Sequence, residues 1–133
     1  MRPAWLFPEP ARSFPGARWV RIGLRTAHLI AMGLLVGGVA AGSPPAELPW
    51  AFWGTVVTGA AFVAVELHAS GLFLLQLKGL AVLFKAVLLA GVALAPQAAL
   101  AQLVAAIVVG GISSHMPGRF RYFSPFHGRV IKA

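Results

Sequence analysis

The sequence predicts an all-α integral membrane protein, a four-helix bundle with both termini in the cytoplasm. Three observations predict it: the composition, four separate apolar runs, and the placement of Lys and Arg. Of the 133 residues, 59% are hydrophobic and 11% are charged, and the mean hydropathy is +0.82. Soluble chains carry about 25% charged residues. The composition therefore excludes a soluble enzyme, and its high hydrophobicity excludes a disordered chain.

Four apolar runs are long enough to be transmembrane helices. A bilayer core of about 30 Å requires about 20 apolar residues in helical form. Pro44-Pro45 ends the first run and Pro96 divides the third from the fourth, because proline interrupts helices. We expect a Pro- and aromatic-rich cytoplasmic lead over 1–17, a bundle over 18–115 and a basic, aromatic cytoplasmic tail over 116–133. The expected spans are about 26–42, 49–68, 80–95 and 98–114.

The Lys and Arg residues predict the orientation. Four spans place both termini on the same side, and every Lys and Arg then lies on or near that side, with none left for the two opposite loops. Cytoplasmic loops of membrane proteins carry the excess of Lys and Arg. The pattern predicts a membrane of the bacterial inner-membrane type, with both termini in the cytoplasm.

The lead and the tail are each next to a span, and both contain aromatic side chains. Trp5 and Phe7 in the lead, and Arg119, Arg121 and Phe123 in the tail, are candidates for contact with lipid or a partner. Interleaved bases and aromatics occur in proteins that bind nucleic acid. Next to a span, attraction to anionic headgroups is the simpler interpretation. We expect the lipid bilayer and other membrane subunits or a homo-oligomer as partners, and no nucleic acid.

Ionisable side chains within or beside the spans are functional candidates, because they cost at least a few kcal/mol at membrane depth. All of them fall in the expected cytoplasmic half, which favours one polar site over a continuous channel. With Ser113 and Ser114, they are His28, Glu66, His68, Lys78, Lys85 and His115.

His28 is the strongest candidate ligand. Met32 follows it by four residues on the same helical face. Two histidines from facing helices would form a bis-imidazole haem site, and His68 or His115 would supply the second. Alternatively, His68 and His115 lie at span ends, wetted by headgroups and without a ligand. The chain has no cysteine, so disulfides, iron–sulfur clusters, thiolate zinc and thiol catalysis are excluded.

Lys85 is about six residues inside the third expected span. One interpretation is that it snorkels to the interface. The other is that it pairs with Glu66 or with an anionic ligand such as a haem propionate, since a buried ammonium needs a counter-charge. The predicted cofactor site thus comprises His28, Met32 and Lys85 with His68 and His115, and the three histidines are the candidate metal ligands.

Two segments resemble a known family. Residues 28–38 read His-Leu-Ile-Ala-Met-Gly-Leu-Leu-Val-Gly-Gly, and residues 77–89 read Leu-Lys-Gly-Leu-Ala-Val-Leu-Phe-Lys-Ala-Val-Leu-Leu. They resemble the copper-resistance D family and its relative, the haem-containing J-type protoporphyrinogen oxidase. The resemblance implies haem b or copper bound between helices, with His28 as an axial ligand and Lys85 or Lys78 as the important lysine.

Three functional hypotheses follow. The first is an integral membrane protein that binds haem b and transfers electrons, alone or as a subunit of a redox complex, without catalytic residues of its own. The second is a cofactor-free accessory subunit of a membrane complex. The third is an oxidase of the J type. Copper is a lesser alternative to haem, because Met32 and Met116 are the only soft ligands near the histidines.

Overall fold

The computed structural model describes residues 3–132, which are mostly helical. Four helices are long and apolar enough to cross a membrane, the last counted together with the 3₁₀ turn Pro96–Ala98 that precedes it. They are α1 (Ala17–Ala40), α2 (Pro49–Ala69), α4 (Leu77–Leu94) and α5 (Ala99–His115). The short elements are α3 (Leu72–Leu75), α6 (Gly118–Arg121), the 3₁₀ turn Pro45–Glu47, and the antiparallel pair β1 (Phe123–Ser124) and β2 (Arg129–Val130).

α1 begins nine residues before the position that hydropathy predicts. It starts at Ala17, after Gly16 with its positive φ of 81°, so the arginines at 18, 21 and 25, which precede the expected first span, belong to the helix. Arginine is a good helix former, although it weakens a hydropathy signal. The helix ends at Ala40, and Gly42, with φ of 97°, turns the chain toward Pro44.

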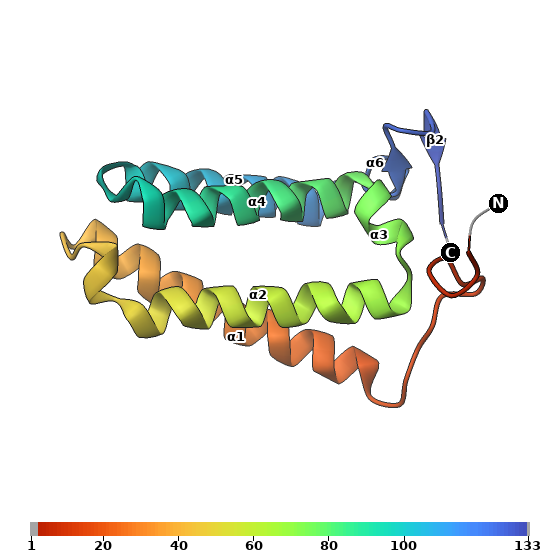
Figure 1. The fold of residues 1–133 in the computed structure, drawn as a ribbon, viewed down its shortest axis with the longest axis horizontal. Helices are drawn as coiled ribbons and strands as arrows, with labels where there is room; N and C mark the ends of the chain where they lie inside the picture. The colour runs from red at the N-terminus through yellow and green to blue at the C-terminus, as the bar shows by residue number, and fades with distance from the viewer. Residues whose placement is uncertain (1–2, 133) are drawn as a thin grey trace.

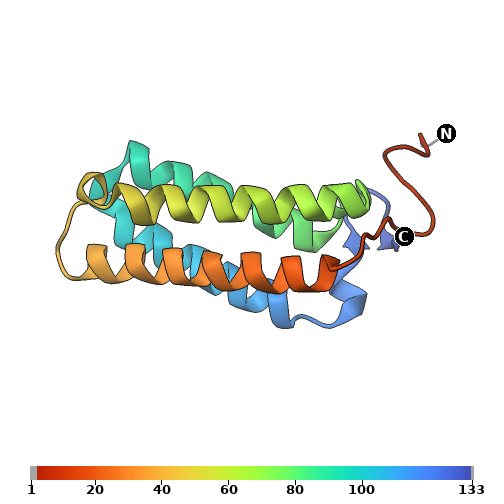
Figure 2. The same ribbon diagram turned by 90° about the horizontal axis from the view of Figure 1, so that it is seen from below.

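The helices form two antiparallel hairpins, α1 with α2 and α4 with α5, which lie side by side (Figures 1 and 2). We call the end with the two tight connections, Pro45–Glu47 and Pro96–Ala98, the loop end. The opposite end, with residues 3–16, 70–76 and 116–132, is the terminal end. The lead and the tail therefore meet at the same end of the helices.

An apolar cluster joins the two hairpins toward the loop end. Leu35 of α1, Val92 of α4, and Ala99 and Leu103 of α5 are at most 1% exposed. Met32, Val36, Val39, Leu48, Ala51, Phe52 and Leu89 pack around them. This loop-end cluster includes side chains from all four long helices.

Outside this cluster, large apolar side chains point away from the protein. They include Trp50, which is 91% exposed, and Leu94, which is 86% exposed. Contiguous apolar surface of this kind marks contact with a membrane or a partner protein. The exposed faces of the four long helices suit lipid as their solvent.

The terminal end is covered by the lead and the tail. In the lead, the carbonyl of Leu6 accepts a 2.8 Å hydrogen bond from the Gly71 amide, and the Arg12 amide donates to the Ala69 carbonyl over 2.9 Å. A Cβ on Gly71 would lie 2.8 Å from the Leu6 carbonyl oxygen, so this approach requires glycine. In the tail, the buried Ile131 accepts a 2.8 Å hydrogen bond from the Gln76 side-chain amide. Both segments thus dock on the connection between α2 and α4.

The side chains expected to contact lipid or a partner differ in how they are held. Trp5 is 73% exposed, and Arg119 is exposed with its guanidinium 4.7 Å from the Phe120 ring centre. Arg121 instead donates to the Ser114 carbonyl at the end of α5. Phe7 and Phe123 are half-buried, and Phe123 pairs with Val130 between β1 and β2. Contact with lipid or a partner stays a prediction for these residues.

The loop-end cluster should contribute measurably to stability. Leu103→Ala removes a side chain that is 1% exposed and leaves a cavity, so we expect a loss of about 2–5 kcal/mol. Leu100→Ala changes a residue of the same helix that is 42% exposed and should cost much less. Reversible unfolding in mixed detergent micelles measures both, and equal losses would contradict the packing described here.

Candidate site between the two helical hairpins

One face of α1 changes from cationic to apolar along the helix. Arg18, Arg21, Arg25, His28, Met32 and Leu35 follow one another at intervals of three or four residues, which places them on one side of a helix. Arg25 lies over the Phe62 ring of α2 at 5.6 Å, whereas Leu35 belongs to the loop-end cluster. The polar part of this face is therefore the part near the terminal end.

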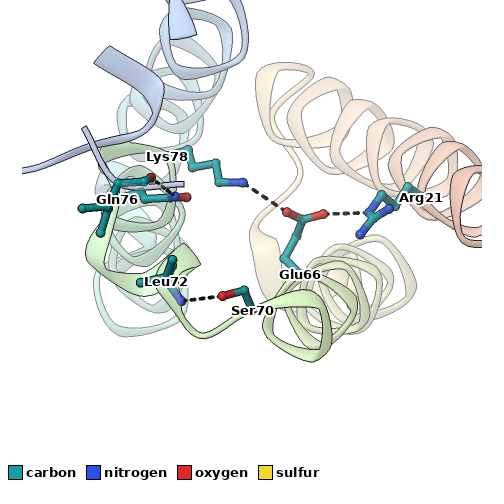
Figure 3. Close-up of polar contacts among 7 residues, drawn as sticks. Arg21, Glu66, Ser70, Leu72, Gln76 and Lys78 are labelled. Carbon is teal, nitrogen blue, oxygen red and sulfur yellow. Dashed lines mark hydrogen bonds and ion pairs between the residues drawn. The ribbon is translucent and has the colours of Figure 1, made fainter. Parts of the chain in front are cut away.

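Glu66 of α2 joins the two hairpins at this end (Figure 3). Its Oε1 accepts a 2.9 Å hydrogen bond from Nε of Arg21 on α1, and its Oε2 lies 3.4 Å from Nζ of Lys78 on α4. The Glu66 side chain is only 15% exposed. Glu66 is thus paired with Arg21 and Lys78, and not with Lys85 as one interpretation of the sequence expects. We call this arrangement the Glu66 clasp.

Lys78 is also held by aromatic rings. Its ammonium lies 5.4 Å from the ring centre of Phe73 and 5.2 Å from that of Tyr122. Cation–π attraction at such distances adds to the ion pair. Lys78 therefore connects the clasp to α3 and to the C-terminal tail.

The connection between α2 and α4 holds Lys78 in place. Ser70 accepts a hydrogen bond from the Leu72 amide at the start of α3 (3.3 Å), and Gly79 packs against the carbonyl of Phe73 so closely that a Cβ would overlap it. The side chain of Gln76, beside Lys78, is buried, and its Oε1 has no hydrogen-bond partner within residues 3–132. The tight turn and the tail together determine where α4 begins.

His28 lies deeper, against α2. Its Nδ1 is 3.0 Å from Oγ1 of Thr58, and that hydroxyl donates its proton to the Gly54 carbonyl over 2.6 Å. Because a hydroxyl has one proton, Nδ1 of His28 must be the donor to Thr58. The hydrogen-bond network thus assigns the proton to Nδ1 and leaves Nε2 as the nitrogen with a free lone pair. Gly59 allows this packing, because a Cβ there would lie 3.1 Å from the ring.

Lys85 of α4 reaches toward the same space. A Cβ on Gly110 of α5 would lie 3.6 Å from its Nζ, and Lys85 lies close enough to His28 and Arg25 to interact electrostatically with both. In the described part of the chain, neither Lys85 nor Arg25 forms an ion pair or a side-chain hydrogen bond. The structure therefore brings together three basic side chains, Arg25, His28 and Lys85, which we call the basic cluster.

His68 and His115 lie apart from His28. His68 is exposed and meets the Phe14 ring at 6.0 Å, in a surface cavity lined also by Ala64 and Val65. It follows Thr58 by ten residues, or about 15 Å along a helix. His115 is exposed, and its Nδ1 lies 2.9 Å from the Gly111 carbonyl of its own helix. Each of the two histidines thus has a local contact of its own, and neither contacts His28 within residues 3–132.

Met32, the other expected ligand on α1, lies one turn beyond His28. Met32 packs against the loop-end cluster. Across residues 3–132, no group of three or more His, Asp or Glu side chains is arranged to hold a metal ion. Of the expected cofactor residues, the structure thus unites His28 and Lys85 only.

The chain matches no protein-family model, no curated protein and no solved structure. The resemblance to the copper-resistance D family thus rests on the two sequence segments alone.

The Glu66 clasp and the role of Arg25 were not predicted from the sequence. The information was present in the spacing, because Arg18, Arg21, Arg25 and His28 repeat at three and four residues, as residues on one helical face do. Because the expected first span begins at residue 26, these arginines lay outside the predicted helix, and their common face was not recognised. Thr58 gave no signal, because a threonine in an apolar span is ordinarily satisfied by its own helix.

Breaking the Glu66 clasp should destabilise the protein. Glu66→Gln removes the carboxylate that pairs with Arg21 and Lys78, and leaving charged groups unpaired in a partly buried site costs about 1–3 kcal/mol. Glu47→Gln is a matched control, because Glu47 is exposed in the loop-end turn. Lys78→Met combined with Glu66→Gln should lose less than the sum of the two single changes. Additive losses in a detergent unfolding series would show that the pair does not interact.

Proposed function

We propose that the protein spans a membrane of the bacterial inner-membrane type four times, with its terminal end on the cytoplasmic side. The charges support this orientation. The two loop-end connections, Pro45–Glu47 and Pro96–Ala98, carry no Lys or Arg. By contrast, the lead has two arginines, the start of α1 has three, and the tail has three arginines and one lysine. Positive residues stay in the cytoplasm when a membrane protein inserts.

The orientation is tested by single cysteines, which report cleanly because the natural chain has none. Ala46→Cys lies in the loop-end turn and Arg129→Cys in the tail, and both positions are exposed. In intact cells, an impermeant maleimide should label position 46 only, and both should label after lysis. Labelling at 129 in intact cells would reverse the proposed topology.

We further propose that the protein binds haem b between its hairpins, with His28 as the iron ligand, and serves electron transfer alone or within a redox complex. The state of His28 carries this proposal: its Nδ1 donates to Thr58, which leaves Nε2 free. Ligating histidines characteristically donate their other nitrogen to a neighbouring acceptor, which orients the ring. Arg25 and Lys85, both without a carboxylate partner, suit the anionic propionates of the cofactor. Bound haem would supply one-electron redox chemistry.

The proposal assigns one axial ligand, His28, because neither His68 nor His115 contacts it within residues 3–132. A second axial ligand would have to come from a partner subunit, a second copy or a small molecule. Copper stays the lesser alternative, because it would rely on Met32 as the soft ligand on the His28 face of α1, and Met32 packs against the loop-end cluster. Oxidase activity of the J type stays a second alternative, and no catalytic residue is assigned to it.

A cofactor-free accessory subunit is the competing proposal. The placement of His68 and His115 favours it, since each has a local contact that explains it without a metal: His68 with Phe14 and His115 with Gly111. The apolar lead and the ordered tail would then be the contacts with lipid or with other subunits of a membrane complex.

The absorbance spectrum of purified protein decides between the two. If His28 ligates haem, the wild type should show a Soret band, and His28→Ala should lose most of it while the protein still inserts, since four apolar helices drive insertion. His115→Ala, which changes an exposed histidine bonded to its own helix, should keep the band. A wild-type protein without a Soret band would favour the accessory role.

A further inference from the structure

The C-terminal tail folds back and is fastened beside the start of α4. The Ile131 amide donates to the Tyr122 carbonyl over 2.9 Å, and the Ile131 carbonyl accepts a 2.8 Å hydrogen bond from Nε2 of Gln76. Gln76 is 4% exposed and Ile131 is 6% exposed. Lys132 follows, with its ammonium 5.2 Å from the Tyr122 ring centre. The tail is therefore docked through a buried polar contact.

Tyr122 is the residue through which the docked tail meets Lys78. Nζ of Lys78 lies 5.2 Å from the Tyr122 ring centre, 5.4 Å from that of Phe73, and 3.4 Å from Oε2 of Glu66. A lysine side chain is long and flexible, so fixing its ammonium costs conformational entropy. The two rings restrict the positions of the ammonium, and they thereby favour the one from which Lys78 reaches Glu66 on the other hairpin (Figure 3).

The two ends of the molecule are joined by different kinds of contact. At the terminal end, the Glu66 clasp joins side chains that keep some exposure, 33% for Arg21, 26% for Lys78 and 15% for Glu66. Toward the loop end, the hairpins share closely packed apolar side chains. Ion pairs that water reaches contribute little stability, whereas a packed cluster resists separation. We therefore expect the hairpins to separate first at the terminal end.

The docked tail also carries a local cost. Oε1 of Gln76 is buried and has no hydrogen-bond partner within residues 3–132. A buried acceptor without a donor is unfavourable, and it regains hydration when the tail leaves. The cations of the tail, Arg119, Arg129 and Lys132, are exposed even while it is docked. The balance between the docked and the released tail is therefore closer than the buried hydrogen bond alone suggests.

We propose that the C-terminal tail is a latch for the two hairpins, formed by Tyr122 and Ile131 of the tail with Gln76 and Lys78. While Ile131 is bound to Gln76, Tyr122 holds Lys78 in reach of Glu66, and the terminal end stays closed. When the tail leaves Gln76, Lys78 loses the Tyr122 ring and the clasp weakens. The hairpins then separate at the terminal end, while the loop-end cluster still joins them. This conformational role goes beyond the proposed function and does not rest on haem.

Pairs of spin labels measure the separation of the hairpins at each end, and they report cleanly because the chain has no cysteine. Ile22→Cys on α1 with Ile112→Cys on α5 forms the terminal-end pair. Trp50→Cys on α2 with Leu94→Cys on α4 forms the loop-end pair. All four positions are exposed. Electron paramagnetic resonance of the full-length protein in detergent micelles gives the distance distribution of each pair.

Tyr122→Leu and Gln76→Leu each release one contact of the latch. The first removes the ring but keeps an apolar side chain, and the second removes the donor to Ile131. Each should raise the ratio of open to closed molecules at the terminal-end pair about tenfold, the effect of one lost hydrogen bond or cation–π contact. The loop-end pair should not change. Tyr122→Phe, which keeps the ring, and Phe126→Leu, which changes an exposed ring of the tail, should both match the wild type.

The coupling between the tail and the clasp has its own test. Glu66→Gln should also open the terminal-end pair, because Lys78 then has no carboxylate to hold. Adding Tyr122→Leu to Glu66→Gln should therefore open it little further. If the two changes add fully, the tail and the clasp act independently, and the latch is rejected.

The latch is also overturned if neither Tyr122→Leu nor Gln76→Leu lengthens the terminal-end distance. Equal lengthening at both pairs would contradict it as well, since that result indicates general unfolding. Opening in Tyr122→Phe as large as in Tyr122→Leu would show that the ring does not hold Lys78. None of these measurements uses haem, so a failed latch leaves the haem proposal standing, and a missing Soret band leaves the latch standing.

Discussion

The high cost of a charge in hydrocarbon decides how this molecule is arranged. A lipid-facing carboxylate or ammonium is unfavourable by several kcal/mol, and Glu66 avoids this cost by facing two cations. Glu66 is 15% exposed and takes a cation from each hairpin, Arg21 from α1 and Lys78 from α4. Because the partners come from different hairpins, satisfying one charge also joins the two halves of the protein at the terminal end.

The second connection between the hairpins is apolar and lies toward the other end. Lipid tails are as apolar as leucine, so Leu35, Val92 and Leu103 gain little from leaving lipid and gain mainly from close packing. Together, the clasp and the cluster hold the hairpins near both ends and leave the middle, with His28 and Lys85, between them. The two connections thus differ in kind, one made by charge at the terminal end and one by close apolar packing toward the loop end.

Composition predicts much of the architecture, but it does not predict which charged side chains pair with one another. Mean hydropathy and proline positions were sufficient to predict four membrane-spanning helices close to α1, α2, α4 and α5. Hydropathy averages over a window, so it placed the start of α1 after its arginines, although those arginines are helical. The span boundaries do not reveal which lysine of α4 pairs with Glu66. The structure selects Lys78, which follows the tight turn where Gly79 packs on Phe73. His68 likewise turns toward Phe14 because of its rotation on α2, which the span boundaries do not reveal.

The scarcity of acidic residues has a consequence for the interior. The sequence has 11 Lys and Arg but only 3 Asp and Glu. Two of these acids lie outside the four long helices, Glu9 in the lead and Glu47 in the loop-end turn. Exposed cations of the tail can take counter-charges from anionic headgroups, which attract basic segments beside a membrane. Arg25 is exposed and Lys85 is half-buried, so their charges differ in what they require. An exposed guanidinium reaches water or headgroups directly. The Lys85 ammonium, about 12 Å along α4, has no acidic partner among residues 3–132, so it depends on its long stem to bring the charge to the interface.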